Sequence, residues 1–135
     1  MRAIMADNDV KGQVAILAKL LEAEPWREFW LSLNLPLWTF ADVPLAVDAS
    51  DAAVWHACQR EQVILITGNR NKKGLDSLEA TIQKHNTAPS LPVMTIADPD
   101  EVIFNRPYAH KVVEALLQYL LEIDKVRGTG RLWLP

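Results

Sequence analysis

The feature that most constrains this sequence is VILIT, at residues 63–67. Four successive apolar residues precede the threonine, and no polar residue alternates with them. A strand with one face in water alternates polar and apolar side chains, whereas a strand of a parallel sheet is covered by helices on both faces. The segment therefore predicts an α/β fold in which 63–67 is a doubly covered strand.

The rest of the chain supplies the other strands and helices that such a fold needs. Short apolar runs predict further strands at 2–6, 35–40 and 92–96. Apolar residues at helical spacing predict helices at 11–22, 51–62, 75–85 and 108–124. This alternation predicts a three-layer α/β/α sandwich with a mostly parallel sheet of about four to five strands.

Length and composition fit a single domain spanning residues 1–135. Half of the residues are hydrophobic, which is enough to bury a core without a disulfide or a structural metal. The one cysteine, Cys58, excludes an internal disulfide and a cysteine metal cage. Residues 128–135 (GTGRLWLP) are a partly apolar C-terminal tail, which we expect to dock on the body of the protein or on a second subunit. The tail and the tryptophan content together indicate a homodimer.

Charge and hydropathy limit what the protein binds and where it acts. A net charge of −3 does not indicate a general polyanion binder. The N-terminal residues lack the apolar core of a signal peptide, and no apolar run approaches the roughly 20 residues needed to cross a bilayer. We therefore expect a cytoplasmic protein with no membrane partner.

Local signals predict where several elements begin and which side chains face inward. Ser50 can cap the helix that follows it, with Asp51 in the first turn. The helix at 75–85 is expected to turn Leu75, Leu78 and Ile82 toward the core. Residues 98–100 predict a turn. The last helix carries a wide apolar stripe at Val112, Val113, Leu116, Leu117, Leu120 and Leu121.

Polar residues directly follow several of the predicted strands. They are Asp7, Asn8 and Asp9, then residues 68–71, then Asp98 and Asp100, while Asp51 opens a helix. In open α/β sheets ligands bind beyond the carboxyl ends of the strands, so we expect several of these oxygens to converge on one rim. Carboxylate and amide oxygens without histidine or cysteine suit a hard cation, Mg²⁺ or Mn²⁺.

A purely structural interpretation stands beside this one. Asp and Asn are common in turns and helix caps for backbone reasons alone. Asp51 can be only a first-turn charge, and Asp98 with Pro99 only a turn. Asp7 is the strongest functional candidate, because capping alone hardly explains an acidic residue at the exit of a central strand.

The other reactive residues give weaker signals. Cys58 is expected to be a small buried apolar residue. The histidines have no metal-ligand spacing and are interpreted as ordinary helix residues: His56, His85 and His110. Three basic residues suit either a phosphate backbone or a solvated surface: Arg70, Lys72 and Lys73.

Three motifs, in order, resemble those of the PIN-like nuclease family. MADNDV resembles the family's first strand and its Asp-Glu-Asn type of motif, and SDAAVWHACQREQ resembles its acidic residue opening an alanine-containing helix. VILITGNRN resembles its buried strand ending in Thr-Arg-Asp-Arg-Asp. The match covers roughly the first two thirds of the chain and is to short bacterial proteins often found in toxin–antitoxin settings.

The resemblance implies a set of site residues by position. Asp7 and Asp51 would be metal-binding carboxylates, and Asn69 and Asn71 stand where the family usually has two aspartates; these four are the implied catalytic residues. The implied ligands of Mg²⁺ or Mn²⁺ are Asp7, Asp9, Asp51 and Asn69. The implied substrate-binding residues are Arg70, Lys72 and Lys73. Because the asparagines are neutral, metal binding is expected to be weakened.

Two functions follow from the resemblance, and both stay open. One is a metal-dependent ribonuclease that serves as a toxin component with a weakened active site. Its substrate would be RNA and its partner an antitoxin protein. The other is a degenerate PIN-like scaffold that binds a protein or a nucleic acid. A third interpretation is a phosphoacceptor receiver domain, because Arg106-Pro107 faintly resembles the Lys-Pro of that family. The stretch ITGN, however, has no aspartate to accept the phosphoryl group.

Overall fold

A computed structural model describes residues 1–135 and contains a five-stranded sheet in which every pair is parallel. The strands are β1 (Ala3–Ala6), β2 (Leu37–Trp38), β3 (Val63–Thr67), β4 (Val93–Ile96) and β5 (Arg131–Leu134). The α-helices are α1 (Lys11–Leu21), α2 (Arg27–Leu33), α3 (Asp51–Glu61), α4 (Leu78–His85), α5 (Pro99–Phe104), α6 (Arg106–Leu121) and α7 (Ile123–Val126). Two 3-10 helices span Asn8–Val10 and Phe40–Asp42.

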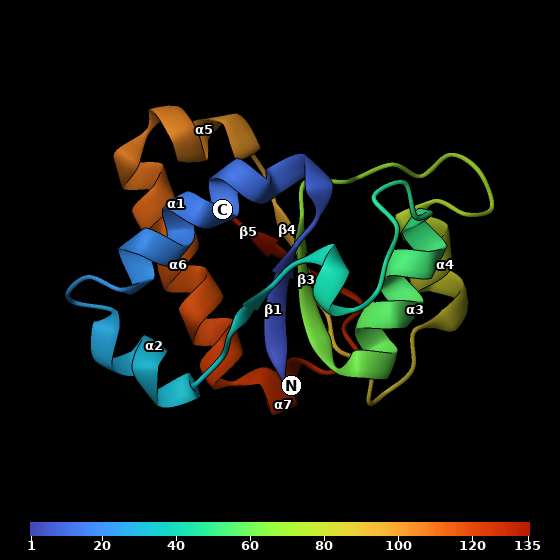
Figure 1. Ribbon diagram of the computed structural model, residues 1–135, viewed down its shortest axis with the longest axis horizontal. Coiled ribbons are helices and arrows are strands. Elements are labelled where there is room, and N and C mark those ends of the chain that lie inside the picture. The colour runs from blue at the N-terminus through green and yellow to red at the C-terminus, as the bar shows by residue number, and fades with distance from the viewer.

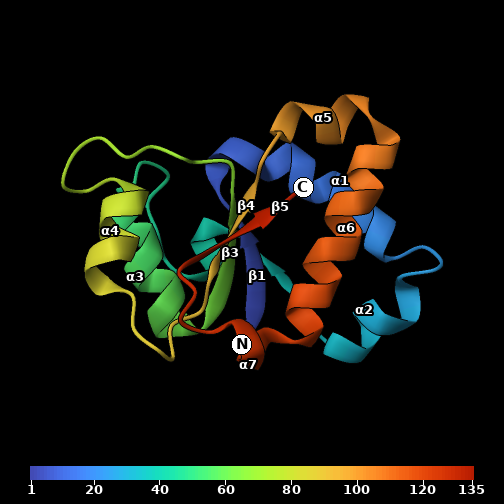
Figure 2. The same cartoon turned by 180° about the vertical axis from the view of Figure 1, so that it is seen from behind.

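The helices form two layers, one on each face of the sheet. Helices α1, α2, α5 and α6 lie on one side, and α3 and α4 lie on the other (Figures 1 and 2). The predicted three-layer α/β/α sandwich is therefore confirmed. No helix combines the length and the apolar character that spanning a membrane requires.

Strand β3 explains why the sheet needs both helical layers. All five of its residues are buried. Ile64 and Ile66 pack in a core cluster with residues of α1 and α6, whereas Val63 and Leu65 pack in a second cluster with residues of α3 and α4. Because successive side chains of a strand point to opposite faces, an uninterrupted apolar run feeds two cores at once.

The order of the strands creates a switch point between β1 and β3. The sheet runs β2-β1-β3-β4-β5, so the chain passes from β1 to β2 on one side and then returns to β3 on the other. The crossover from β1 to β2 carries α1 and α2 over one face of the sheet, whereas the return from β2 to β3 carries α3 over the other face. The helices therefore separate above the carboxyl ends of β1 and β3, which is where open α/β sheets form a binding crevice.

The C-terminal tail docks on the body of the protein as the fifth strand. Arg131 to Leu134 pair with Val93 to Ile96 of β4, and Leu134 is fully buried. One of the two expected positions of the tail is thus confirmed. The tail was not predicted as a strand, because four residues near a chain end give too short a pattern to reveal a period.

The helix predicted at 75–85 begins three residues later, at Leu78. The side chain of Ser77 caps it by accepting a hydrogen bond from the backbone N–H of Ala80, at 3.1 Å. The prediction for Leu75 is wrong: this side chain is 95% exposed, whereas Leu78 and Ile82 are buried. A leucine before the cap continues the apolar spacing by coincidence but belongs to the preceding loop.

The turn predicted at 98–100 is also wrong, because Pro99 opens α5. Proline is well suited to the first turn of a helix, where its missing N–H has no partner to lose. The last long helix starts at Arg106 and ends at Leu121, which is 46% exposed. The other five residues of its predicted stripe are buried.

Candidate functional site

Asp7 lies at the carboxyl end of β1, beside the end of β3. Its Oδ2 accepts a hydrogen bond from the Thr67 hydroxyl at 2.8 Å, and its Oδ1 accepts one from the backbone N–H of Asn8 at 2.8 Å. Pairing of Ala6 with Ile66 places the two strand ends side by side. Asp7 therefore both caps the following 3-10 helix and reaches across to β3.

Asp9 lies next to Asp7 on the same rim. Its carboxylate faces the backbone N–H of Gly68, with Oδ2 at 3.2 Å. Although the residue as a whole is exposed, its carboxyl group is partly shielded from water. This burial raises the pKa of Asp9, and the negative charge of Asp7 raises it further. A side chain at Gly68 would crowd it, because a Cβ there would stand 3.1 Å from Asp9 Oδ2 and 3.0 Å from Pro99 Cγ.

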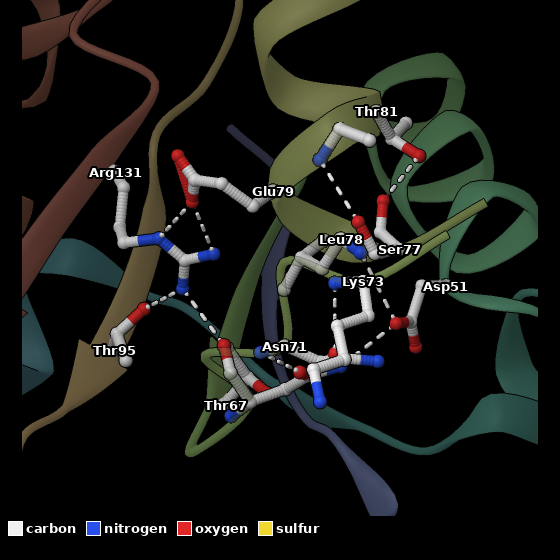
Figure 3. Close-up of polar contacts among 12 residues, drawn as sticks. Asp51, Thr67, Asn71, Lys73, Ser77, Leu78, Glu79, Thr81, Thr95 and Arg131 are labelled. Atoms are coloured by element: carbon white, nitrogen blue, oxygen red, sulfur yellow. Dashed lines mark hydrogen bonds and ion pairs between the residues drawn. The ribbon is translucent and has the colours of Figure 1, made fainter. Parts of the chain in front are cut away.

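Asp51 opens α3 and reaches two other segments. The predicted cap is confirmed, since the Ser50 hydroxyl oxygen accepts a hydrogen bond from the N–H of Ala53 at 3.1 Å. The Oδ2 atom of Asp51 accepts a hydrogen bond from the Asn69 side-chain amide at 2.9 Å. It also accepts one from the backbone N–H of Leu78 at 3.1 Å (Figure 3). Asp51 thus ties the starts of α3 and α4 to the loop that follows β3.

Asn69 holds the centre of this arrangement in one orientation. Its Oδ1 accepts a hydrogen bond from the backbone N–H of Asn71 at 2.8 Å, while its Nδ2 donates to Asp51. Its own backbone N–H donates to the Thr67 hydroxyl oxygen at 3.0 Å. The two neighbours determine which way the amide points, because a carboxylate requires the NH₂ and an N–H requires the oxygen. The Asn69 amide places a hydrogen-bond donor where an aspartate would place a second negative charge.

These contacts form a continuous series from Asp7 through Thr67 and Asn69 to Asp51. Residues about 44 positions apart in the sequence therefore belong to one rim, as expected from the topology. No group of three or more aspartate, glutamate, histidine or cysteine side chains gathers closely enough to hold a metal ion. Of the implied ligands, Asp7 and Asp9 are the pair whose charges interact, and Asn69 directs its nitrogen at Asp51.

Asn71 contributes to the loop rather than to the acidic rim. It is exposed, and its Oδ1 accepts a hydrogen bond from the backbone N–H of Lys73 at 3.0 Å. Successive asparagine-to-backbone bonds of this kind fold the loop into tight turns. The three basic residues of the loop are all exposed: Arg70, Lys72 and Lys73. Arg70 also lies over the Trp133 ring of β5, 6.0 Å from its centroid.

Asp98 stands apart from the hydrogen-bonded series. It is exposed, and its backbone N–H donates to the Tyr108 hydroxyl oxygen at 3.0 Å. Burial, assisted by the charges of Asp98 and Glu101, raises the pKa of Tyr108. Cys58 is buried as expected, and burial together with the charge of Asp7 raises the pKa of its thiol to about 12. A thiol with that pKa is protonated at neutral pH.

Arg131 is a residue of this region that sequence reasoning missed. Its Nη1 donates to the backbone carbonyl of Asn69 at 2.9 Å and to the Thr95 hydroxyl at 2.6 Å. Its Nε and Nη2 donate to Glu79 Oε2 at 3.1 and 2.9 Å (Figure 3). With its side chain only 8% exposed, Arg131 fastens the loop after β3 to β4, β5 and α4. Thr67 was missed as a partner of Asp7, although aligning the two predicted strand ends would have indicated it.

No family model, no curated protein and no solved structure matches this chain. The assignment of a function therefore depends on the three sequence motifs and on the geometry of the rim.

Proposed function

We propose that this protein is a divalent-metal-dependent ribonuclease of the PIN-like type, a weakened toxin component that acts in the cytoplasm and is held in check by an antitoxin protein. The observation that carries the proposal is the series of hydrogen bonds from Asp7 through Thr67 and Asn69 to Asp51. It lies at the switch point of the sheet, where α/β proteins bind their ligands.

Asp7 and Asp9 are the residues that would hold Mg²⁺ or Mn²⁺. Burial and then the negative charge of Asp7 raise the pKa of Asp9, and a cation shared between the two carboxylates would remove the repulsion between them. When bound, such an ion activates water and stabilises the leaving oxygen of a phosphodiester. Thr67 would keep Asp7 oriented through its hydroxyl group, and Asp51 would extend the negative rim toward α3.

The loop after β3 would bind the substrate backbone. Its three basic side chains are exposed and follow directly after the residues of the rim: Arg70, Lys72 and Lys73. Basic side chains that contact the phosphates of a nucleic acid give affinity without sequence preference, and this affinity falls as the salt concentration rises. RNA cleavage by this protein should therefore weaken with added salt.

The second candidate, a scaffold without catalysis, is favoured by one specific contact. The Asn69 amide donates to Asp51 and its oxygen is engaged by Asn71, so this half of the rim is satisfied without a cation. A site of this kind binds metal weakly, because an amide brings no negative charge to an ion. In this case the same loop and rim would bind a protein or a nucleic acid without cleaving it.

Titration of the protein with Mn²⁺ in a calorimeter, followed by cleavage assays on single-stranded RNA, tests the enzyme proposal. We expect saturable, millimolar-scale binding and cleavage that requires the metal, with both lost in Asp7→Asn. The matched control is Asp124→Asn, an exposed carboxylate in α7 at the far end of the sheet, which should leave both unchanged (Figure 1). If no saturable binding occurs and Asp7→Asn changes nothing, the ribonuclease is excluded and the scaffold remains.

A further inference from the structure

The helical layer formed by α1, α2, α5 and α6 carries most of the large hydrophobic side chains that are exposed. Nine large hydrophobic side chains of the chain are exposed, and five of them lie on α2, α5 and α6: Phe29, Leu31, Ile103, Phe104 and Leu121. Phe104 is 82% exposed. Exposed apolar side chains gathered on one helical layer indicate an interaction surface.

A first hollow, the basic hollow, lies between α1, α5 and α6 and has a volume of about 350 Å³. Its walls are mostly apolar and include Ile16, Leu20 and Phe104. The only charged residues that line it are Lys19 and Arg106. The basic hollow therefore suits an apolar group accompanied by negative charge.

A second hollow, the acidic hollow, lies between α2 and α6 and has a volume of about 290 Å³. Trp26, Phe29 and Leu121 are among its apolar walls. Its charged residues are Glu114 and Glu122. The acidic hollow therefore suits an apolar group accompanied by positive charge, which is the reverse of the first hollow.

The two hollows lie toward opposite ends of α6. The basic hollow uses Arg106 and Ala109 from the first turn, and the acidic hollow uses residues from Glu114 onward. In Figure 2, α6 runs from α5 down to the level of α2. A two-fold axis across the middle of α6 would bring the basic hollow of one copy onto the acidic hollow of the other, and the reverse at the second end.

The charges on the exposed side of α6 are also arranged so that a two-fold axis would pair opposite charges. Its exposed residues include Pro107, Lys111, Glu114 and Gln118, which recur at helical spacing on one face. Lys111 and Glu114 flank the midpoint of this set. In an antiparallel pair of α6 helices, each Lys111 would therefore stand against Glu114 of the other copy.

From these complementary charges we propose that the protein forms a two-fold homodimer through an antiparallel pairing of α6. Phe104 of each copy fills the acidic hollow of the other, against Trp26 and Phe29. Two Lys111–Glu114 pairs close the centre, and Arg106 meets the acidic edge formed by Glu114 and Glu122. This interface involves neither the C-terminal tail nor the rim at the switch point, so it is independent of the proposed ribonuclease activity.

Sedimentation equilibrium over a range of concentrations tests the interface. The wild-type protein should have twice the chain mass of 15.2 kDa, and Phe104→Glu should have the mass of one chain. Leu75→Glu is the matched control, because Leu75 is still more exposed but lies on a loop outside this layer, and it should remain dimeric. Circular dichroism checks that each variant is folded.

Exchange of the central charges gives a test that does not depend on removing an apolar group. Lys111→Glu and Glu114→Lys should each raise the dimer dissociation constant by about tenfold or more, since each places like charges together twice. The double variant should restore dimerisation to about the wild-type level. A monomeric wild-type protein overturns the proposal and leaves this face to a different protein. A dimer that persists in Phe104→Glu overturns it too, as does a double variant that fails to restore dimerisation.

Discussion

Asn69 determines how the rim is held together when no ion is bound. Its amide joins Asp51 to the turn that contains Asn71, and its backbone joins both to Thr67. An aspartate at this position would keep the bond to the Asn71 N–H but would face the Asp51 carboxylate without a donor. Two facing carboxylates are destabilising unless a cation lies between them.

Asn69→Asp should therefore destabilise the metal-free protein and strengthen metal binding. We expect the free energy of unfolding to fall by about 1–3 kcal/mol, because a hydrogen bond is replaced by repulsion at a partly buried position. Mn²⁺ should recover this loss and should bind about tenfold more tightly than to the wild type. Thermal unfolding with and without Mn²⁺ measures both effects.

Asn71→Asp is the matched control for this change, since it alters the same atom in the same loop at an exposed position. It should change stability and Mn²⁺ affinity little. If the two variants behave alike, Asn69 has no particular role at the rim.

Asp9 gives the rim a defined pH dependence. Its pKa in the folded protein is raised above the ordinary value of 3.8, so the unfolded chain releases this proton at a lower pH than the folded protein does. The ionised Asp9 carboxyl thus costs stability. This cost is absent well below pH 3.8, grows as the pH rises from 3.8 to the folded pKa, and is complete above the folded pKa. Asp9→Asn should therefore be more stable than the wild type at neutral pH.

The difference between Asp9→Asn and the wild type should disappear when denaturation is repeated below pH 3.8. If the variant and the wild type are equally stable at neutral pH, or if the variant is the less stable of the two there, then burial and the Asp7 charge do not destabilise the ionised Asp9 carboxyl.

At the scale of elements, β5 does more than lengthen the sheet. Arg131 projects from this strand and holds the loop after β3 through the carbonyl of Asn69, while Glu79 of α4 neutralises its charge. The position of the basic loop therefore depends on a strand that is about 60 residues away in the sequence.

Arg131→Met should destabilise the fold by about 2–4 kcal/mol, because it leaves the partly buried Glu79 carboxylate without its partner. It should also speed hydrogen exchange at residues 69–77, which lose their anchor to the sheet. Urea denaturation and hydrogen-exchange mass spectrometry measure these two effects. Arg70→Met, at an exposed position of the same loop, should change neither by a comparable amount.

At the scale of the whole molecule, the two cores depend on a sheet that is complete to its last strand. Leu134 of β5 belongs to the core cluster that α1 and α6 share, and β5 covers the edge of β4 over four residue pairs. Without β5 the edge of β4 would be unpaired, and that core would lose a wall.

Deletion of residues 128–135 should therefore abolish cooperative thermal unfolding and promote aggregation through the bare edge of β4. Deletion of Pro135 alone, which is exposed, should leave the transition unchanged. Calorimetry and light scattering distinguish these outcomes. A truncated chain that unfolds cooperatively near the wild-type temperature would mean that β5 is dispensable.

The layers of this fold could be predicted from the sequence, because the uninterrupted apolar run in VILIT is compatible with few environments. Sequence reasoning also reached the common rim, since Asp7 and Asp51 follow from the order of the elements. It failed where a local pattern was incomplete: Leu75 continues an apolar spacing that the Ser77 cap interrupts. Arg131 could not be found, because its contacts with Asn69 and Glu79 join distant segments and leave no periodicity in the sequence.

Because β1 and β5 run in the same direction, the first and last residues of the chain stand at opposite ends of the sheet (Figure 1). Pro135 follows the carboxyl end of β5, on the side of the molecule that carries Asp7 and Asp51, whereas Met1 precedes the amino end of β1. A polyhistidine purification tag appended after Pro135 would bring imidazoles close to the acidic residues and compete for divalent ions. Protein for metal titrations is best produced with an N-terminal tag.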